Sequence, residues 1–124
     1  MGDHEKGQKL IEQLFGSLGG GDRPAFNDMM ELTCDYLFGE IWSREGLPVK
    51  DRSLITVAVL TATSQGTQLR GHLKGALNVG HSPEALREVM IHVAHYAGWP
   101  TGMNGLAALE EVMAEKGLSF SDAS

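Results

Sequence analysis

The segment from Leu54 to Ala62 is apolar on nearly every side of a helix, with only Thr56 and Thr61 inside the run. A helix at the surface of a globular protein keeps one polar face, so this pattern predicts a central helix, beginning near Asp51, that other elements surround. The run is far shorter than the ~20 apolar residues that a membrane span needs. The chain is therefore expected to fold around this helix.

Helical spacing of apolar residues recurs along the rest of the chain. Glycines 19–21 end the first helix, Asp22 caps the second ahead of Pro24, and Ser82 caps the fifth ahead of Pro83. No strand alternation and no repeat is evident, so we expect an all-α fold in a single domain over residues 1–124. The expected segments are an N-terminal region over 1–21 with a helix over 4–18, helices over 24–38, 51–62, 67–79 and 83–97, a last helix that starts at Pro100 and includes the apolar Met113, and a frayed tail over 118–124.

The helix over 83–97 carries two apolar sectors. Its expected core face is formed by Leu86, Val89, Val93 and Tyr96. Ile91 and Ala94 lie on the other side. A second apolar sector predicts a second contact surface, most simply with another subunit.

Charge and cysteine content exclude several classes of protein. The chain has 124 residues, a net charge of −6 and no long basic run, which argues against a nucleic-acid or anionic-membrane partner. The one cysteine, Cys34, allows no intrachain disulfide. Its helical surroundings favour a small buried hydrophobe over a catalytic thiol, because no base is near it in the sequence. No signal peptide is visible at the N-terminus, so we expect a cytoplasmic protein.

A central motif, Gln68-Leu69-Arg70-Gly71-His72, is accompanied by an apolar Gly-Glu-Ile-Trp segment upstream and a Tyr-Ala-Gly-Trp-Pro segment downstream. From about Asp22 to Lys116 the chain resembles the carboxymuconolactone decarboxylase family, and its decarboxylase branch more than its relatives. The matching stretches, in the family's order, are Tyr36 to Trp42, Arg52 to Thr56, Leu69 to His72, Ala76 to Asn78 with Gly80, and Glu88-Val89 through Tyr96 to Pro100.

This resemblance implies a compact, alkylhydroperoxidase D-like helical subunit. It also implies a homo-oligomer, commonly a hexamer built as a trimer of dimers, with a pocket formed partly between subunits. No metal and no organic cofactor is implied. The family's namesake reaction removes CO2 from 4-carboxymuconolactone to give the 3-oxoadipate enol-lactone, a step in the breakdown of protocatechuate.

The sister branch, which resembles alkylhydroperoxidase D, needs a Cys-x-x-Cys pair ending four residues before the histidine. Gln65 and Gln68 stand at those positions, and Ser53 stands where that branch has a relay glutamate. Without thiols there is neither a thiolate nucleophile nor a disulfide relay. The sequence therefore excludes thiol peroxidase activity.

Three residues are the candidates for catalysis. His72 lies at the edge of an apolar stripe, where it either stabilises an oxyanion or delivers a proton, or is simply hydrogen-bonded at the helix edge. Arg52 is either a clamp for a substrate carboxylate or the partner of Asp51 or Glu40 in a salt bridge. Glu40 lies in an apolar segment, where it could pass a proton or pair with Arg52. A cluster of Glu40, Arg52 and His72 would combine these roles.

Further residues are candidates for substrate binding. Gln68 lies one turn before His72 on the same face, and close decarboxylase relatives often have glutamate there, which leaves the exact substrate open. Trp42 and Tyr96, with Trp99, would form pocket walls, although aromatic residues in a helical core are more often packing. Arg44 is a second basic candidate.

A metal site is not expected from the histidines. His92 and His95 are three residues apart, but on a helical wheel His95 points away from the core, and no carboxylate completes a ligand set with His72. His81 and His4 are expected to be loop and terminal residues. Two alternatives to the lactone decarboxylase remain: an enzyme of the same fold acting on another small lactone or oxo-acid, and a non-catalytic module that binds a small ligand.

Overall fold

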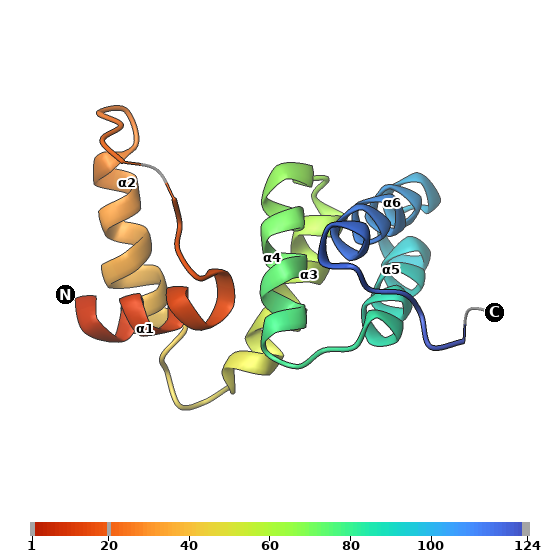
Figure 1. Ribbon diagram of the computed structural model, residues 1–124, viewed down its shortest axis with the longest axis horizontal. Helices are drawn as coiled ribbons and strands as arrows, with labels where there is room; N and C mark the ends of the chain where they lie inside the picture. Colours follow the sequence, from red (N-terminus) through yellow and green to blue (C-terminus); the bar gives the residue numbers. More distant parts are fainter. Residues whose placement is uncertain (1, 20, 123–124) are drawn as a thin grey trace.

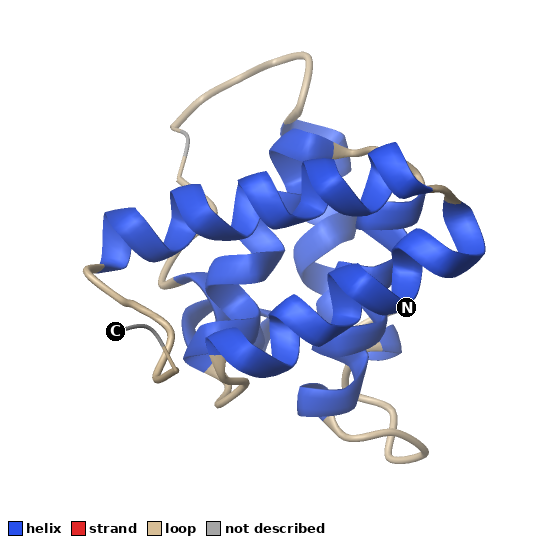
Figure 2. Ribbon diagram, turned by 90° about the vertical axis from the view of Figure 1, so that its right-hand side faces the viewer, coloured by secondary structure: helices blue, strands red, loops and turns tan. Residues whose placement is uncertain are grey.

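A computed structural model describes residues 2–19 and 21–122. These residues form helices joined by loops, as Figure 2 shows, so the predicted all-α fold is confirmed. The elements in chain order are α1 (His4–Phe15), α2 (Asn27–Leu32), the π-helix η1 (Thr33–Ile41), α3 (Val49–Ala62), α4 (Gly66–Asn78), α5 (Pro83–Ala97) and α6 (Trp99–Lys116).

The chain packs around two apolar clusters. The larger is shared by α3, α4, α5 and α6 and is centred on fully buried residues such as Val57, Leu73 and Leu109. The smaller joins α1 to η1 through Leu14, Phe38 and their neighbours. Figure 1 shows α1 and α2 on one side of the molecule and α3 to α6 on the other, with the loop after η1 connecting them. The interior therefore has a seam between two helical layers.

Contacts between α1 and α4 close this seam. The side-chain Nδ2 of Asn78 donates a hydrogen bond of 2.7 Å to the carbonyl of Leu14. Gly75 lets the two helices approach, because a Cβ atom there would lie 3.2 Å from the Phe15 ring. The end of α1 is thereby fixed against the C-terminal part of α4.

Local sequence signals place one of three helix boundaries correctly. Ser82 accepts a hydrogen bond of 3.1 Å from the amide of Ala85, with Pro83 opening α5, so the predicted cap is confirmed. Asp22 is not a helix cap: it accepts from the Asn27 side chain, and α2 begins only at Asn27. The first helix ends at Phe15, earlier than expected, because Gly16 adopts φ +79. Of the three glycines expected to end it, Gly20 lies outside the described residues.

Helix α3 is central on one face only. Ser53, Val57 and Thr61 are buried, whereas Ile55 and Val59 are 51% and 53% exposed. The prediction that other elements surround this helix on all sides is therefore wrong for the single chain. The exposed side continues into an apolar groove between α3 and α5, with Ala58 and Val89 among its lining residues.

The core face of α5 also differs from the prediction. Met90 is fully buried, but Tyr96 is 84% exposed, because it lies in the last turn and its ring stacks on His92 along the helix. Ala94 faces α6, because a Cβ built on Gly102 of that helix would lie 2.5 Å from the Cβ of Ala94. Of the two residues expected on a second surface, Ile91 alone is exposed.

The C-terminal segment contacts α5, although its composition predicts fraying. Phe120 packs against the larger cluster, and the amide of Ser121 donates a hydrogen bond of 2.7 Å to Glu84. Arg87 pairs with Asp122 at 2.7 Å. The last two residues of the predicted tail, 123 and 124, lie outside the described residues. No helix in the described part of the chain combines the length and the apolarity that crossing a membrane requires.

Candidate functional site

His72 lies at the seam between the two helical layers. Its imidazole ring is enclosed by two aromatic side chains. The Trp42 ring stacks on it with centroids 6.1 Å apart and planes inclined by 29°, and the Phe15 ring meets it edge-on at 5.1 Å. Trp42 is in turn packed against Phe38 at 5.2 Å. Three elements, α1, α4 and the end of η1, thus position one histidine.

Burial determines the charge of this histidine. Loss of contact with water lowers the pKa of His72 below its ordinary value, since the charged form is the one that burial disfavours. The imidazole is therefore neutral at neutral pH. A neutral imidazole has one donor nitrogen and one acceptor nitrogen, and can therefore serve as either.

Three buried polar side-chain atoms have no hydrogen-bond partner among the described residues. They are Oε2 of Glu40, Oγ of Ser53 and Nδ1 of His72. Leaving such an atom unpaired costs about 1–3 kcal/mol, so a native fold that keeps three of them calls for an explanation. Of the three, Nδ1 of His72 belongs to the ring that the aromatic side chains enclose, and a polar ligand there would supply its missing partner.

Glu40 lies near the end of η1, two residues before the tryptophan that covers His72. With Lys6 and Arg44 it lines a shallow hollow of 370 Å³ beside the first turn of α1. Within the described residues neither carboxylate oxygen pairs with Arg52 or His72. The expected cluster of Glu40, Arg52 and His72 is therefore not joined by direct hydrogen bonds or ion pairs.

Arg52 holds the loop between η1 and α3. Its Nε donates to the carbonyl of Leu47 at 3.0 Å, and one Nη donates to the carbonyl of Arg44 at 3.3 Å. The salt bridges to Asp51 or Glu40 that the sequence offered as alternatives are not formed. The guanidinium group keeps further N–H donors, and the side chain is only half-buried.

The other predicted site residues differ in exposure. Trp42 is 6% exposed, whereas Gln68 lies exposed one turn before His72 on α4. Tyr96 and Trp99 are exposed on α5 and at the start of α6. Of the aromatic residues predicted to form pocket walls, Trp42 contacts the His72 ring within one chain, whereas Tyr96 stacks on His92.

The remaining histidines do not gather around His72. His95 Nδ1 lies 2.7 Å from the carbonyl of Ile91 on its own helix, and His92 stacks on Tyr96. His81 Nε2 lies 2.7 Å from the carbonyl of Lys50. Each of these rings is thus engaged with its local surroundings.

The sequence does not single out Phe15 as a site residue, and it does not reveal the burial of Ser53, which stands where the sister branch has a glutamate. Phe15 fits a core stripe, and nothing in its spacing indicates that it touches a histidine 57 positions away. Ser53 is a hydroxyl in an apolar helix, which is a usable signal, but its complete burial shows only in three dimensions. Arg70, next to the motif histidine, turns to α6 and pairs with Glu111 at 2.6 Å.

Comparisons with known proteins identify the family of this chain. A model of the carboxymuconolactone decarboxylase family matches residues 27–111, which include Glu40, Ser53 and His72. The chain is 37% identical over 92 residues to the 4-carboxymuconolactone decarboxylase of Acinetobacter baylyi, across 74% of this chain and 69% of that protein. It is 31% identical over 90 residues to the nitrosuccinic acid decarboxylase npaB of Metarhizium robertsii, across 70% of this chain and 63% of that protein.

A third relative aligns with this chain over nearly the whole length of that relative. It is an uncharacterized 15.0 kDa protein from the nqo9-nqo10 intergenic region of Paracoccus denitrificans, 31% identical across 88% of this chain and 94% of that protein. The family model matches well over half of the chain, in a segment that includes Trp42 and His72 but not α1. This chain belongs to the carboxymuconolactone decarboxylase family.

Proposed function

We propose that this chain is a cofactor-independent carboxy-lyase that converts 4-carboxymuconolactone to the 3-oxoadipate enol-lactone in the breakdown of protocatechuate. The observation that carries the proposal is the buried Nδ1 of His72, which lies between two aromatic rings without a partner. The relative from Acinetobacter baylyi, which is named for this substrate, supports the choice.

The reaction needs little from a protein beyond binding and proton transfer. The bond between the ring carbon and the carboxylate breaks, and CO2 leaves without the bonding electron pair. Those electrons pass into the conjugated lactone carbonyl, which becomes a dienolate, and a proton is then returned to carbon. Since the substrate is its own electron sink, the protein has to hold carboxylates, stabilise the developing oxyanion and supply the proton.

His72 is the proposed oxyanion partner. In its neutral form with the proton on Nδ1, the imidazole would donate a hydrogen bond to the lactone oxygen as negative charge develops there. Trp42 and Phe15 keep water away from this nitrogen, and a hydrogen bond in such surroundings is stronger than it is in water. The missing partner of Nδ1 is, on this proposal, the substrate.

Glu40 and Arg52 complete the proposed catalytic set. The buried Oε2 of Glu40 is the proposed proton donor, since a carboxyl group there has no competing partner among the described residues. Arg52 would use the N–H groups that remain after its two carbonyl contacts to hold a substrate carboxylate. Gln68, exposed on the same helix as His72, would contact a second polar group of the substrate.

The proposal includes a homo-oligomer, a hexamer arranged as a trimer of dimers. Ile55, Val59 and Ile91 expose apolar area on α3 and α5, which is the kind of surface that an interface between copies would bury. Tyr96, exposed in a single chain, would reach a pocket only in such an assembly. No partner other than a small-molecule substrate and further copies of the chain is proposed, and its place is the cytoplasm.

One observation favours a second candidate, decarboxylation of another small lactone or oxo-acid. Gln68 stands where close decarboxylase relatives often have glutamate, and one relative of this chain is named for nitrosuccinic acid. A panel of carboxylated lactones and small oxo-acids, assayed for CO2 release, separates the two. Turnover of 4-carboxymuconolactone well above the rest supports the main proposal. Turnover of another acid alone supports the second, and saturable binding without any turnover indicates a binding module.

A further inference from the structure

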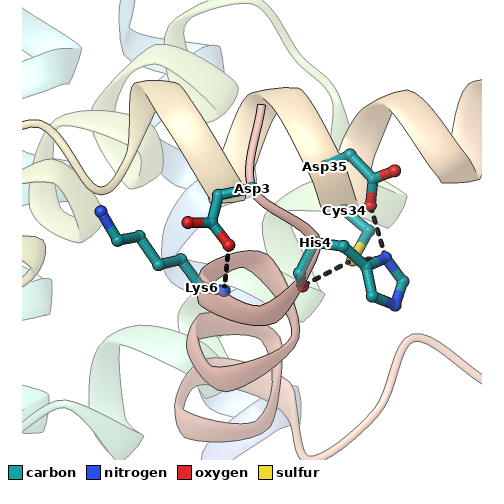
Figure 3. Close-up of polar contacts among 5 residues, drawn as sticks. All are labelled: Asp3, His4, Lys6, Cys34 and Asp35. Carbon is teal, nitrogen blue, oxygen red and sulfur yellow. Dashed lines mark hydrogen bonds and ion pairs between the residues drawn. The ribbon is translucent and has the colours of Figure 1, made fainter. Parts of the chain in front are cut away.

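Three side chains of different chemical kinds meet where the first turn of α1 crosses η1. His4 Nδ1 lies 2.6 Å from Oδ1 of Asp35 and 3.8 Å from Sγ of Cys34, as Figure 3 shows. The three donor atoms all lie within 4.8 Å of one another. Imidazole nitrogen, thiolate sulfur and carboxylate oxygen are the ligand types that zinc prefers in proteins.

The geometry distinguishes a metal site from a catalytic triad. In a nucleophile–base–carboxylate triad the imidazole uses one ring nitrogen for the nucleophile and the other for the carboxylate. Here the thiol and the carboxylate both face Nδ1. One nitrogen cannot accept a proton from the thiol while donating one to the carboxylate. Convergence of three donor atoms on one point is the arrangement that a bound cation needs.

The distances fit zinc after a small adjustment. Tetrahedral coordination with bonds of about 2.0–2.3 Å places donor atoms about 3.3–3.6 Å apart. The separation of 3.8 Å between Sγ and Nδ1 is already close to this range. The contact between Nδ1 and Oδ1 has to widen, and the His4 side chain, 61% exposed, is free to rotate by that amount.

The backbone holds the two elements together in this register. The amide of Asp3 donates a hydrogen bond of 2.8 Å to the carbonyl of Asp35. Gly7 and Gly39 allow the close crossing. A Cβ on Gly7 would lie 1.8 Å from the Cys34 carbonyl oxygen, and a Cβ on Gly39 would lie 2.1 Å from the Asp3 carbonyl oxygen. Asp3 also caps α1 by accepting from the amide of Lys6 at 3.1 Å. The backbone position of His4 is therefore fixed before any ligand binds, while its side chain can still rotate.

All three side chains also line a cavity of 490 Å³ between α1 and the segment before η1. We propose that His4, Cys34 and Asp35 bind one Zn²⁺ ion through Nδ1, Sγ and Oδ1, with a water molecule from this cavity in the fourth position. The thiol releases its proton to solvent when the metal binds. None of the three ligands is a residue to which the proposed decarboxylation assigns a role, so the metal site is tested independently of it.

The test uses the full chain, purified without a polyhistidine tag and made metal-free, with Co²⁺ as a spectroscopic probe and Zn²⁺ as its competitor. The expected result is one equivalent of Co²⁺ with a sulfur-to-cobalt charge-transfer band that Zn²⁺ abolishes. Cys34→Ser should lose the band, and His4→Ala should weaken Zn²⁺ binding by at least about tenfold. His95→Ala is the matched control, an exposed histidine on another helix, and should bind as the wild type does.

Thermal unfolding gives a second readout that does not depend on the cobalt absorption band. Zn²⁺ should raise the melting temperature of the wild type and of His95→Ala, and chelator should reverse the shift, because a ligand that binds the folded state stabilises it. His4→Ala, which alters an exposed side chain, should fold normally and show no shift. Absence of the cobalt–thiolate band, or an unchanged Zn²⁺ affinity in His4→Ala, would overturn the proposal.

Discussion

The indole ring of Trp42 lies over the imidazole ring of His72, with centroids 6.1 Å apart and planes inclined by 29°. Phe15 meets the same imidazole edge-on. This enclosure removes the ring from water and lowers the pKa of His72. A histidine held neutral by aromatic neighbours suits hydrogen bonding to a developing oxyanion better than it suits permanent charge pairing.

Burial of His72 predicts a pH-dependent stability. The pKa of His72 is lower in the folded state than its unfolded value of about 6.5, so the unfolded chain binds more protons between the two values and the free energy of unfolding rises with pH there. The contribution is fully present above about pH 6.5 and is lost as the pH falls through the folded-state pKa. Denaturant unfolding across this range, with His72→Gln for comparison and His95→Gln as control, measures it. An equal pH dependence in His72→Gln would contradict the assignment.

Ser53 provides a test in which stability and activity change separately. Its hydroxyl is fully buried and unpartnered among the described residues, so Ser53→Ala should leave the free energy of unfolding unchanged or raise it by about 1 kcal/mol. If the hydroxyl faces the substrate, the same variant should turn over more slowly. Chemical denaturation and CO2 release measure the two effects. A clear loss of stability would mean that the hydroxyl has a partner in the fold.

The crossing of α1 over η1 predicts a strong sensitivity to one methyl group. Gly7→Ala would place a Cβ 1.8 Å from the Cys34 carbonyl, so the variant should lose about 1–3 kcal/mol or more of unfolding free energy. Gly71→Ala is the matched control, because no atom lies within 4 Å of its Cβ and alanine favours a helix interior by about 0.5–1 kcal/mol. Equal stability of the two variants would show that the helices do not cross this closely.

Self-association is expected to depend on the exposed face of α3. Val59→Glu adds a charge at a side chain that is 53% exposed in the single chain, so it should leave the subunit folded and reduce the size of the assembly. Gln13→Glu, an exposed position on α1, is the control. Sedimentation velocity with circular dichroism measures both properties. A monomeric wild type, or an assembly unchanged by Val59→Glu, would count against this interface.

Much of the fold follows from local sequence signals. Helix α5 has the predicted bounds, and Ser82 caps it, because a cap, a proline at the first turn and helical spacing of apolar residues all agree there. The prediction is less accurate for the helix expected over 24–38, because much of that segment belongs to the π-helix η1. In η1 the hydrogen bonds span five residues, as from the amide of Trp42 to the carbonyl of Leu37, so a wheel drawn for an α-helix misplaces the side chains.

The candidate site is predictable only in part. Sequence motifs identify both His72 and Trp42, but their contact joins elements far apart in the sequence, which periodicity does not reveal. The spacing of Tyr96 fits the core stripe of α5, whereas the last turn of that helix leaves the ring exposed. The sequence predicts a terminal residue at His4 and a small hydrophobe at Cys34. Their contact is not predictable from local patterns, because only the crossing of α1 and η1 brings the two residues together.

CO2 release from 4-carboxymuconolactone by the purified wild-type protein and by His72→Ala tests the proposed decarboxylation directly. The wild type should release CO2 stoichiometrically and form the enol-lactone. His72→Ala, with assembly and helicity unchanged, removes the imidazole donor and should turn over roughly 10²–10³-fold more slowly, the cost of losing one oxyanion donor. No turnover by the wild type would contradict the proposed substrate. Equal turnover by the folded variant would contradict the proposed role of His72.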